Sequence, residues 1–412
     1  MNNREVICLQ MNTYVPYVLF TNVNFIKFNF VNTKKETSLE TLLNWHKINY
    51  EKQLFGRYIH VSLILKLLEN LPPEFEVIQR GFSVEKRPIH SVTIGTGKTK
   101  ILLWSQMHGN ESTTTKALFD LFKAFQNSSE LSIFKDILSS CTLCIIPILN
   151  PDGAAAYTRV NANSIDLNRD AQHKSQPESV LLWEIYKEFA PNFCFNLHGQ
   201  RTIFGFEDTG TPSILSFLAP SADAERSITL SRKRSMQVIA HIHKELSPYL
   251  SENIGLYDDG FNIHCTGDTF QANKTPTILF EAGHFPNDYD REITRQYVFM
   301  AIVAALENTM STTSSIDEQL YLSIPVHQKC YCDILFKNSL DGDVGIQFVE
   351  KLTRNNIEFV PEFSSEETTS SMFGHRVIDA SGVEIKKLLS EKLIGKPDIR
   401  HLTLDDGRTI TL

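Results

Sequence analysis

Several features that would mark a specialised class of protein are scarce in this sequence of 412 residues. Seven cysteines in a chain of this length do not form a disulfide framework. The formal net charge of -8 and the lack of a dense Lys/Arg run argue against a nucleic-acid partner. No apolar run is continuous enough to cross a bilayer, so we expect no membrane span. The composition, 42% hydrophobic and 21% charged, is ordinary for a globular protein.

The N-terminal region comes nearest to a membrane or export signal. Residues 14–30 are apolar and aromatic, but Asn22, Asn24 and Lys27 interrupt them. A signal peptide combines a basic start, a continuous apolar stretch and a small-residue cleavage site, and this region does not. We therefore expect residues 1–40 to form a peripheral segment, and the protein to be cytoplasmic. The sequence gives no indication of the oligomeric state.

Cys141 and Cys144 have the spacing of a metal-binding pair, but they lie within an apolar run that ends at Pro147. Side chains three positions apart on a strand point to opposite faces of the sheet. A buried structural role for both cysteines is therefore favoured over a metal site.

Strand-like and helix-like patterns alternate through most of the chain. Apolar strand patterns at 100–106, 141–149, 193–197 and 276–281 are followed by helical patterns at 112–126, 178–190, 229–246 and 291–308. Such alternation predicts a layered α/β domain with a largely parallel sheet, which we place at residues 41–310. Shorter strand-like runs and a final helix predict a small appended α+β domain, rich in β-structure, at 316–412.

The segment Gly95-Thr96-Gly97-Lys98-Thr99 is similar to a phosphate-binding loop. The glycine that should open such a loop is missing, because Val92 occupies its place. Since the segment joins two strand-like runs, 89–94 and 100–106, we expect a hairpin turn instead.

Four chemically capable side chains follow or end these strands. His108 and Glu111 lie three residues apart, His198 ends the strand-like run that begins at Phe193, and Glu281 ends another. Two histidines and a carboxylate are the ligand set of a hydrolytic zinc site, which leaves a coordination position open for water. Functional residues gather at strand ends in α/β sheets, so these side chains predict a single zinc hydrolase site with Glu281 as its base.

A His-x-x-Glu spacing alone is weak, but further motifs follow it in order: Asn150-Pro151-Asp152-Gly153, then Arg159-Val160-Asn161, then Asp166-Leu167-Asn168-Arg169. With the His and Glu segments, this order resembles the M14 family of zinc carboxypeptidases over roughly residues 50–310. The resemblance implies a three-layer α/β/α sandwich with a mixed, largely parallel sheet.

The resemblance also implies roles for the residues of the metal centre. It makes His108, Glu111 and His198 the ligands of one zinc ion per chain, and Glu281 the catalytic glutamate. Asp166 matches a carboxylate behind the first ligand histidine, which would fix the tautomer of that ring.

Further residues match the family's substrate-binding positions. Arg159 corresponds to the arginine that stabilises the developing oxyanion. Asn168 and Arg169 correspond to the pair that grips the terminal carboxylate of a substrate, which a guanidinium binds with two parallel hydrogen bonds. Tyr257 lies close to the position of a mobile tyrosine, and the specificity position falls near Asp268.

We expect hydrolysis of an amide bond beside a free carboxylate, with a peptide or a small acyl-amino acid as substrate. The pair Gly109-Asn110 is similar to that of the aspartoacylase and succinylglutamate desuccinylase branch. An amidase or deacylase on N-acyl amino acids or cell-wall peptides is therefore the first alternative. A catalytically silent zinc-binding module is the second. The motif His-Glu-x-x-His is absent, which disfavours a thermolysin-type protease.

Overall fold

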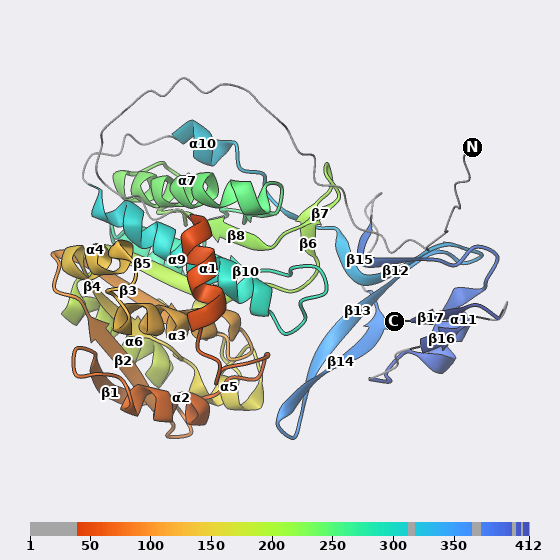
Figure 1. The fold of residues 1–412 in the computed structure, drawn as a ribbon, viewed down its shortest axis with the longest axis horizontal. Coiled ribbons are helices and arrows are strands. Elements are labelled where there is room, and N and C mark those ends of the chain that lie inside the picture. Colours follow the sequence, from red (N-terminus) through yellow and green to blue (C-terminus); the bar gives the residue numbers. More distant parts are fainter. Residues whose placement is uncertain (1–38, 312–317, 365–371, 398–400, 405–406, 412) are drawn as a thin grey trace, which may run out of the picture. The chain divides into compact units, whose positions relative to one another are not determined.

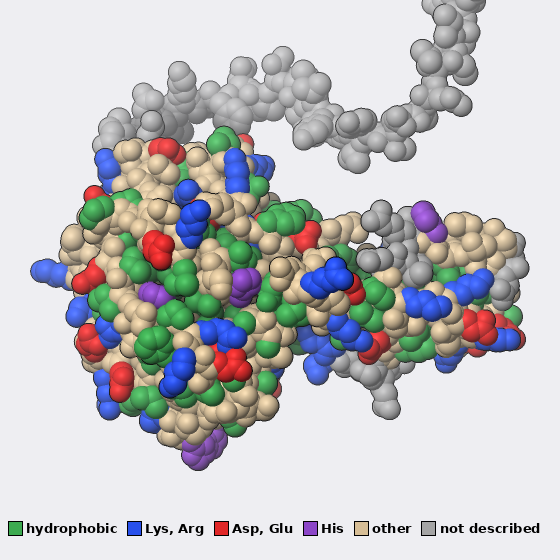
Figure 2. Space-filling view, turned by 90° about the horizontal axis from the view of Figure 1, so that it is seen from below, with side chains coloured by type: hydrophobic (Ala, Val, Ile, Leu, Met, Phe, Trp, Pro, Cys, Tyr) green, Lys and Arg blue, Asp and Glu red, His purple; other side chains and the backbone are tan. Residues whose placement is uncertain are grey.

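The computed structural model describes residues 39–311, 318–364, 372–397, 401–404 and 407–411. The N-terminal segment predicted at 1–40 therefore lies almost wholly outside the described residues. Within the described ranges no helix is long and apolar enough to span a bilayer. On the face drawn in Figure 2, basic and acidic side chains are interspersed with apolar ones.

The main sheet has eight strands in the order β1-β2-β4-β3-β5-β10-β8-β9. The central strands β4, β3, β5 and β10 are mutually parallel, and the flanking pairs β1–β2, β2–β4 and β10–β8 are antiparallel. Their bounds are β1 Glu76–Phe82, β2 Pro88–Ile94, β3 Thr99–Ser105, β4 Cys141–Ile146, β5 Phe193–Gly199, β8 Leu215–Leu218, β9 Ile254–Leu256 and β10 Thr277–Ala282.

Helices cover both faces of this sheet (Figure 1). Their bounds are α1 Leu39–Asn49, α2 Val61–Glu69, α3 Thr113–Gln126, α4 Ser132–Ser140, α5 Pro151–Ala156, α6 Pro177–Phe189, α7 Leu230–Leu250, α8 Thr266–Ala272 and α9 Glu292–Met310. One core packs the sheet against α1, α2, α3, α4, α7 and α9, and the other packs it against α6 and α8. The predicted α/β/α sandwich with a mixed sheet is confirmed.

The central strands are apolar on both faces because helices bury both faces. Cys141 belongs to the core on one side of the sheet, and Cys144 to the core on the other. The prediction that both cysteines are buried on opposite faces is confirmed.

The hairpin predicted at Gly95–Thr99 is wrong, because β4 lies between β2 and β3 and pairs with both. Strand β4 begins 36 residues after β3 ends, pairs with β3 in parallel and takes the place of the predicted hairpin partner.

The C-terminal residues form a second, smaller sheet with its own apolar core. Its strands run in the order β14-β13-β12-β15, and α11 packs against it. The elements of this region are α10 Glu318–Leu322, β11 Gln328–Lys329, β12 Tyr331–Ser339, β13 Gly342–Thr353, β14 Asn356–Phe363, β15 Phe373–Asp379, α11 Ile385–Lys392, β16 His401–Thr403 and β17 Thr409–Thr411. The boundaries 41–310 and 316–412 stay a prediction.

Backbone pairing joins this C-terminal region to the main part of the chain. Strand β11 pairs with β6 (Phe204–Phe206), which pairs in turn with β7 (Thr211–Pro212). The amide of Tyr331 donates to the carbonyl of Ile203 at 3.0 Å. A buried cluster adds to this junction, in which Asp333 accepts from the Tyr289 hydroxyl at 2.9 Å and from the Phe348 amide at 2.7 Å.

A fully buried ion pair ties three helices of the main core together. Arg295 on α9 donates through Nε and Nη2 to Asp120 on α3, at 2.7 and 2.5 Å. The ring of His46 on α1 lies 2.8 Å from the same carboxylate. Removing one member of such a pair leaves an uncompensated charge in the interior.

Replacing Asp120 by Ala should therefore lower the free energy of unfolding by about 3–5 kcal/mol. The matched control is Asp136→Ala on α4, an exposed position expected to change it by less than about 0.5 kcal/mol. Urea unfolding followed by circular dichroism measures both. Equal midpoints for the two variants would contradict the structural importance of the pair.

Candidate active site

The candidate site lies at the carboxyl ends of three adjacent parallel strands. His108 follows β3, His198 is the next-to-last residue of β5, and Glu281 lies near the end of β10. Strand β5 pairs with both β3 and β10, and its register places His198 directly opposite Glu281. The sheet thus brings together residues that are up to 173 positions apart in the sequence.

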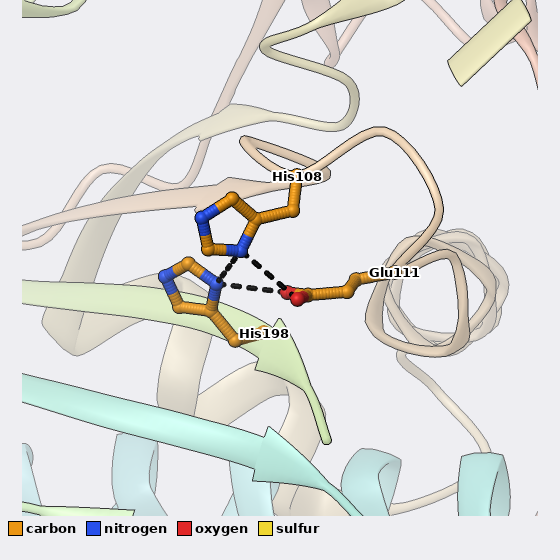
Figure 3. A group of neighbouring side chains, drawn as sticks. All are labelled: His108, Glu111 and His198. Carbon is orange, nitrogen blue, oxygen red and sulfur yellow. Dashed lines mark hydrogen bonds and ion pairs between the residues drawn. The ribbon is translucent and has the colours of Figure 1, made fainter. Parts of the chain in front are cut away.

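His108, Glu111 and His198 point toward one another (Figure 3). The Nδ1 atom of His108 lies 2.9 Å from Glu111 Oε1, and the Nδ1 atom of His198 lies 2.9 Å from Glu111 Oε2. The two Nδ1 atoms are 3.0 Å apart. One ligand atom from each residue lies within 4.8 Å of the others, a spacing at which one cation can bind all three.

The surroundings of this trio suit a zinc ion. The Nε2 atom of His108 lies 3.0 Å from Asp166 Oδ1, so a proton on Nε2 leaves the Nδ1 lone pair directed at the other ligands. With its own Nδ1 in the trio, the buried His198 ring has no partner at Nε2 among the described residues. Two neutral imidazoles and one carboxylate are the donor set of catalytic zinc centres. The residues present therefore fit the metal.

The electrostatics favour the metal-binding forms of His198 and Glu111. At His108, in contrast, the effect of burial is outweighed by Glu111 and Asp166, which raise the pKa of its ring. Burial lowers the pKa of His198 to about 4, so its ring is neutral at neutral pH. Burial acts against the charged form of Glu111 as well, but His108 and His198 outweigh it and hold its pKa below the usual value. An ionised carboxylate and a neutral imidazole are the forms that bind metal.

Glu281 and Arg159 line a cleft of about 760 Å³ together with His108 and Glu111 of the trio. The Oε2 atom of Glu281 is buried and has no hydrogen-bond partner among the described residues. Burial raises the pKa of Glu281, and the negative charge of Glu111 raises it further. Arg159 is 48% exposed, donates to Asp166 at 3.1 Å and lies 3.4 Å from Glu111.

The predicted substrate-binding residues line the same cleft. Asn168 and Arg169 lie in a short 3-10 helix (Leu167–Arg169), whose start Asp166 caps by accepting from the Asn168 amide at 2.9 Å. The guanidinium of Arg169 is exposed to the cleft and donates to the carbonyl of Asn168 at 3.0 Å. Burial raises the pKa of the Tyr257 hydroxyl, and the nearby Glu281 raises it further. Burial also raises the pKa of Asp268, to about 6.

The Asn-Pro-Asp-Gly motif holds the loop that carries His108. Asn150 caps α5 by accepting from the Gly153 amide at 2.9 Å, and its Nδ2 donates to the Met107 carbonyl at 3.2 Å. A Cβ atom at Gly109 would lie 1.9 Å from the carbonyl carbon of Gly153, so only glycine fits there. This motif therefore positions a ligand and does not itself touch the trio.

Sequence reasoning missed the contribution of the C-terminal region, to which it assigned no site residue. Lys329, Asp333, Phe348 and Glu350 all line the cleft. These residues lie on strands without a recognisable motif, and no spacing in the sequence indicates that they face the site.

The comparisons with known proteins add to this geometry. Residues 61–238 match the family model described as zinc carboxypeptidase, peptidase M14. The predicted resemblance to that family is confirmed. The match supports a peptidase hydrolase in general.

Parts of the chain are similar to individual known proteins. Carboxypeptidase SOL1 of Arabidopsis thaliana is 27% identical over 159 residues, which cover 36% of this chain and 32% of that protein. The chain thus matches about a third of the length of this relative. Among solved structures, a metallo-carboxypeptidase from Burkholderia cenocepacia is 18% identical with a TM-score of 0.49, over 60% of this chain and 67% of the other. Carboxypeptidase A from Helicoverpa armigera is 16% identical with a TM-score of 0.48, over 67% and 81%.

The trio predicts how metal content responds to substitution. Wild type should bind one zinc ion per chain, and His108→Ala/His198→Ala should lose it, because a lone carboxylate is a weak ligand for zinc. The control is His173→Ala, an exposed histidine outside the trio. Metal analysis after dialysis measures all three proteins. Equal zinc in the double variant and in wild type would exclude this site.

Proposed function

We propose that the protein is a zinc-dependent carboxypeptidase, which hydrolyses the amide bond beside a free terminal carboxylate of a peptide. The observation that carries the proposal is the position of Glu281. Its Oε2 atom is buried without a partner among the described residues, its backbone lies opposite that of His198, and it lines one cleft with His108, Glu111, Arg159 and Arg169. A proton acceptor, a fixed cation and a carboxylate-binding group thus share one cavity.

The chain's own residues divide the chemistry among them. His108, Glu111 and His198 would hold the zinc, which when bound lowers the pKa of water to about 7 and so provides a nucleophile at neutral pH. Glu281 accepts the proton of the attacking water and returns it to the leaving amine. Its raised pKa suits a group that must both accept and release a proton near neutral pH.

Two arginines stabilise and orient the substrate. Arg159 places its guanidinium beside the trio, where it stabilises the negative charge that develops on the carbonyl oxygen. Arg169, with Asn168, binds the terminal carboxylate and fixes the carbonyl over the site. The Asn168 Oδ1 atom accepts from the Thr266 amide at 3.2 Å, which leaves the Nδ2 amide available as a donor.

The alternative functions have less support. A silent zinc-binding module would not require an unpartnered Glu281, because a buried polar atom without a partner destabilises the fold. An amidase or deacylase on N-acyl amino acids would use the same trio. The cleft has a volume of about 760 Å³, and its lining includes both Asp268 and Phe359 of the C-terminal region, which favours a peptide over a small acyl-amino acid.

Glu281→Gln tests the chemical step. The amide cannot accept the proton from water, so kcat should fall by about 10²–10⁴-fold while zinc content stays at the wild-type level. Glu252→Gln, at an exposed position, serves as the matched control and should retain full activity. Steady-state kinetics on a chromogenic carboxypeptidase substrate gives both values. Near-normal turnover in Glu281→Gln would remove this residue from the mechanism.

A matched pair of peptides, one with a free terminal carboxylate and one amidated, tests the substrate class. Wild type should cleave the free acid about a hundredfold faster, because the clamp orients the scissile carbonyl. Arg169→Met should reduce the ratio of the free-acid rate to the amide rate. Arg169→Lys should restore only part of that ratio, because an ammonium lacks the planar fork of a guanidinium. The measurement is kcat/KM for the free-acid and the amidated peptide on wild type and on each Arg169 variant. Equal rates on wild type would refute exopeptidase action and favour a general zinc amidase.

A further inference from the structure

Two sets of contacts lead away from the metal-binding trio in different directions. On one side, Asp166 contacts His108 and begins the short helix that carries the carboxylate clamp. On the other side, Ser112, the neighbour of Glu111, donates to the carbonyl of Arg57 at 2.5 Å. The guanidinium of Arg57 then pairs with Glu350 on β13 at 2.9 Å. The contacts thus lead from the clamp, through the trio, to the C-terminal sheet.

This order fixes the direction of a bound peptide under the proposed function. A terminal carboxylate at the clamp and a scissile bond at the trio direct the preceding residues toward the C-terminal sheet. The wall there is built by two segments: the loop after β5, which contains Arg201, and the C-terminal residues from Lys329 onward. Strand pairing locks the two segments together, because Lys329 lies opposite Phe204 in the β11–β6 register.

Positive charge exceeds negative charge at this end of the cleft. The cations that line it are Arg57, Arg201, Arg291 and Lys329, and the carboxylates are Asp333 and Glu350. Four cations therefore face two carboxylates. The other acids of the cleft lie at the trio, at Glu281, or near Tyr257 and the clamp.

Both carboxylates are already engaged by the protein. Glu350 pairs with Arg57 and also accepts from the hydroxyl of Tyr157. Asp333 accepts from Tyr289 and from the Phe348 amide, as described above, and also from the side chain of Gln347. Neither acid is therefore available to a cation of a substrate.

Two of the cations, in contrast, keep unused donors. Arg201 and Lys329 are exposed, and no carboxylate of the described residues lies within ion-pair distance of either. The guanidinium of Arg291 is buried and donates to the carbonyls of Ala282 and Gln200, so the exposed Arg201 and Lys329 are the cations that a substrate can reach.

We propose that this end of the cleft is a subsite for an acidic side chain on the substrate, one or two residues before the scissile bond. Arg201 and Lys329 bind the carboxylate at the open rim. Strand β11 of the C-terminal region, which carries Lys329, is accordingly part of the substrate-binding surface. This inference rests on the proposed carboxypeptidase activity and specifies its substrate class.

The test uses blocked peptides that share one terminal residue and carry Glu, Gln or Lys at each of the two preceding positions. Wild type should prefer Glu over the isosteric Gln by about threefold to tenfold in kcat/KM, as expected for one or two partly exposed ion pairs. The preference should shrink between 50 and 500 mM NaCl, because salt screens exposed charges.

Substitutions assign the preference to the two rim cations. Arg201→Gln/Lys329→Gln should reduce the Glu-to-Gln ratio to about one, and Arg201→Glu/Lys329→Glu should make Lys the preferred residue. Lys135→Glu, an exposed charge change on α4 away from the cleft, should leave the ratio unchanged. Zinc content and melting temperature verify that each variant is folded.

The outcomes separate this inference from the proposed function. Cleavage of all free-acid peptides with equal kcat/KM for Glu and Gln, at both positions and at low salt, would overturn the acidic subsite and leave the carboxypeptidase intact. A salt-insensitive Glu preference that survives in the double Gln variant would overturn the role of Arg201 and Lys329. Failure to cleave any free-acid peptide, by a protein that binds zinc, would overturn both.

Discussion

The parallel pairing of β5 with β3 and β10 is the interaction on which the site depends. It places the residue after β3, the end of β5 and the end of β10 at one edge of the sheet. The register sets His198 opposite Glu281, so a slip by one residue would turn one of the two side chains to the other face. The site is therefore as rigid as the buried core beneath it. That rigidity suits a metal centre, whose ligands must keep their positions to within a fraction of an ångström.

The loop between β3 and α3 is held by a second set of constraints. Gln106 has a positive φ of 45° and donates to the carbonyls of Ile59 and Gly109. The backbone of Gly109 packs directly on that of Gly153. A non-glycine residue in the left-handed region is strained, and such strain persists only where surrounding contacts determine the conformation. Here those contacts orient the ring of His108 toward Glu111 and His198.

Two sets of contacts connect the C-terminal sheet to the rest of the cleft: the buried polar cluster around Asp333 and the ion pair between Arg57 and Glu350. Asp333 receives hydrogen bonds from Tyr289, which lies between β10 and α9, and from its own sheet. Arg57 reaches Glu350 from the segment between α1 and α2. Polar groups buried in this way are costly to separate, because each would lose its partner without gaining water. The cleft wall beyond the trio is thus built jointly by segments that are distant in sequence.

Local pattern in the sequence determined four long helices, α3, α6, α7 and α9, together with the central strands and the candidate chemistry. Apolar runs bounded by polar residues identify strands buried on both faces, and His108, Glu111, His198 and Glu281 stand out because they follow such runs. Tertiary structure alone decided which strands pair and which distant residues share the cleft. The position of β4 between β2 and β3 could not be predicted from the residues that join β2 to β3. Strand order depends on contacts between segments that are distant in the sequence. Nothing near Lys329 or Arg201 marks either residue as part of the cleft, because surface charges have no periodicity and acquire a role only when folding brings them to one wall.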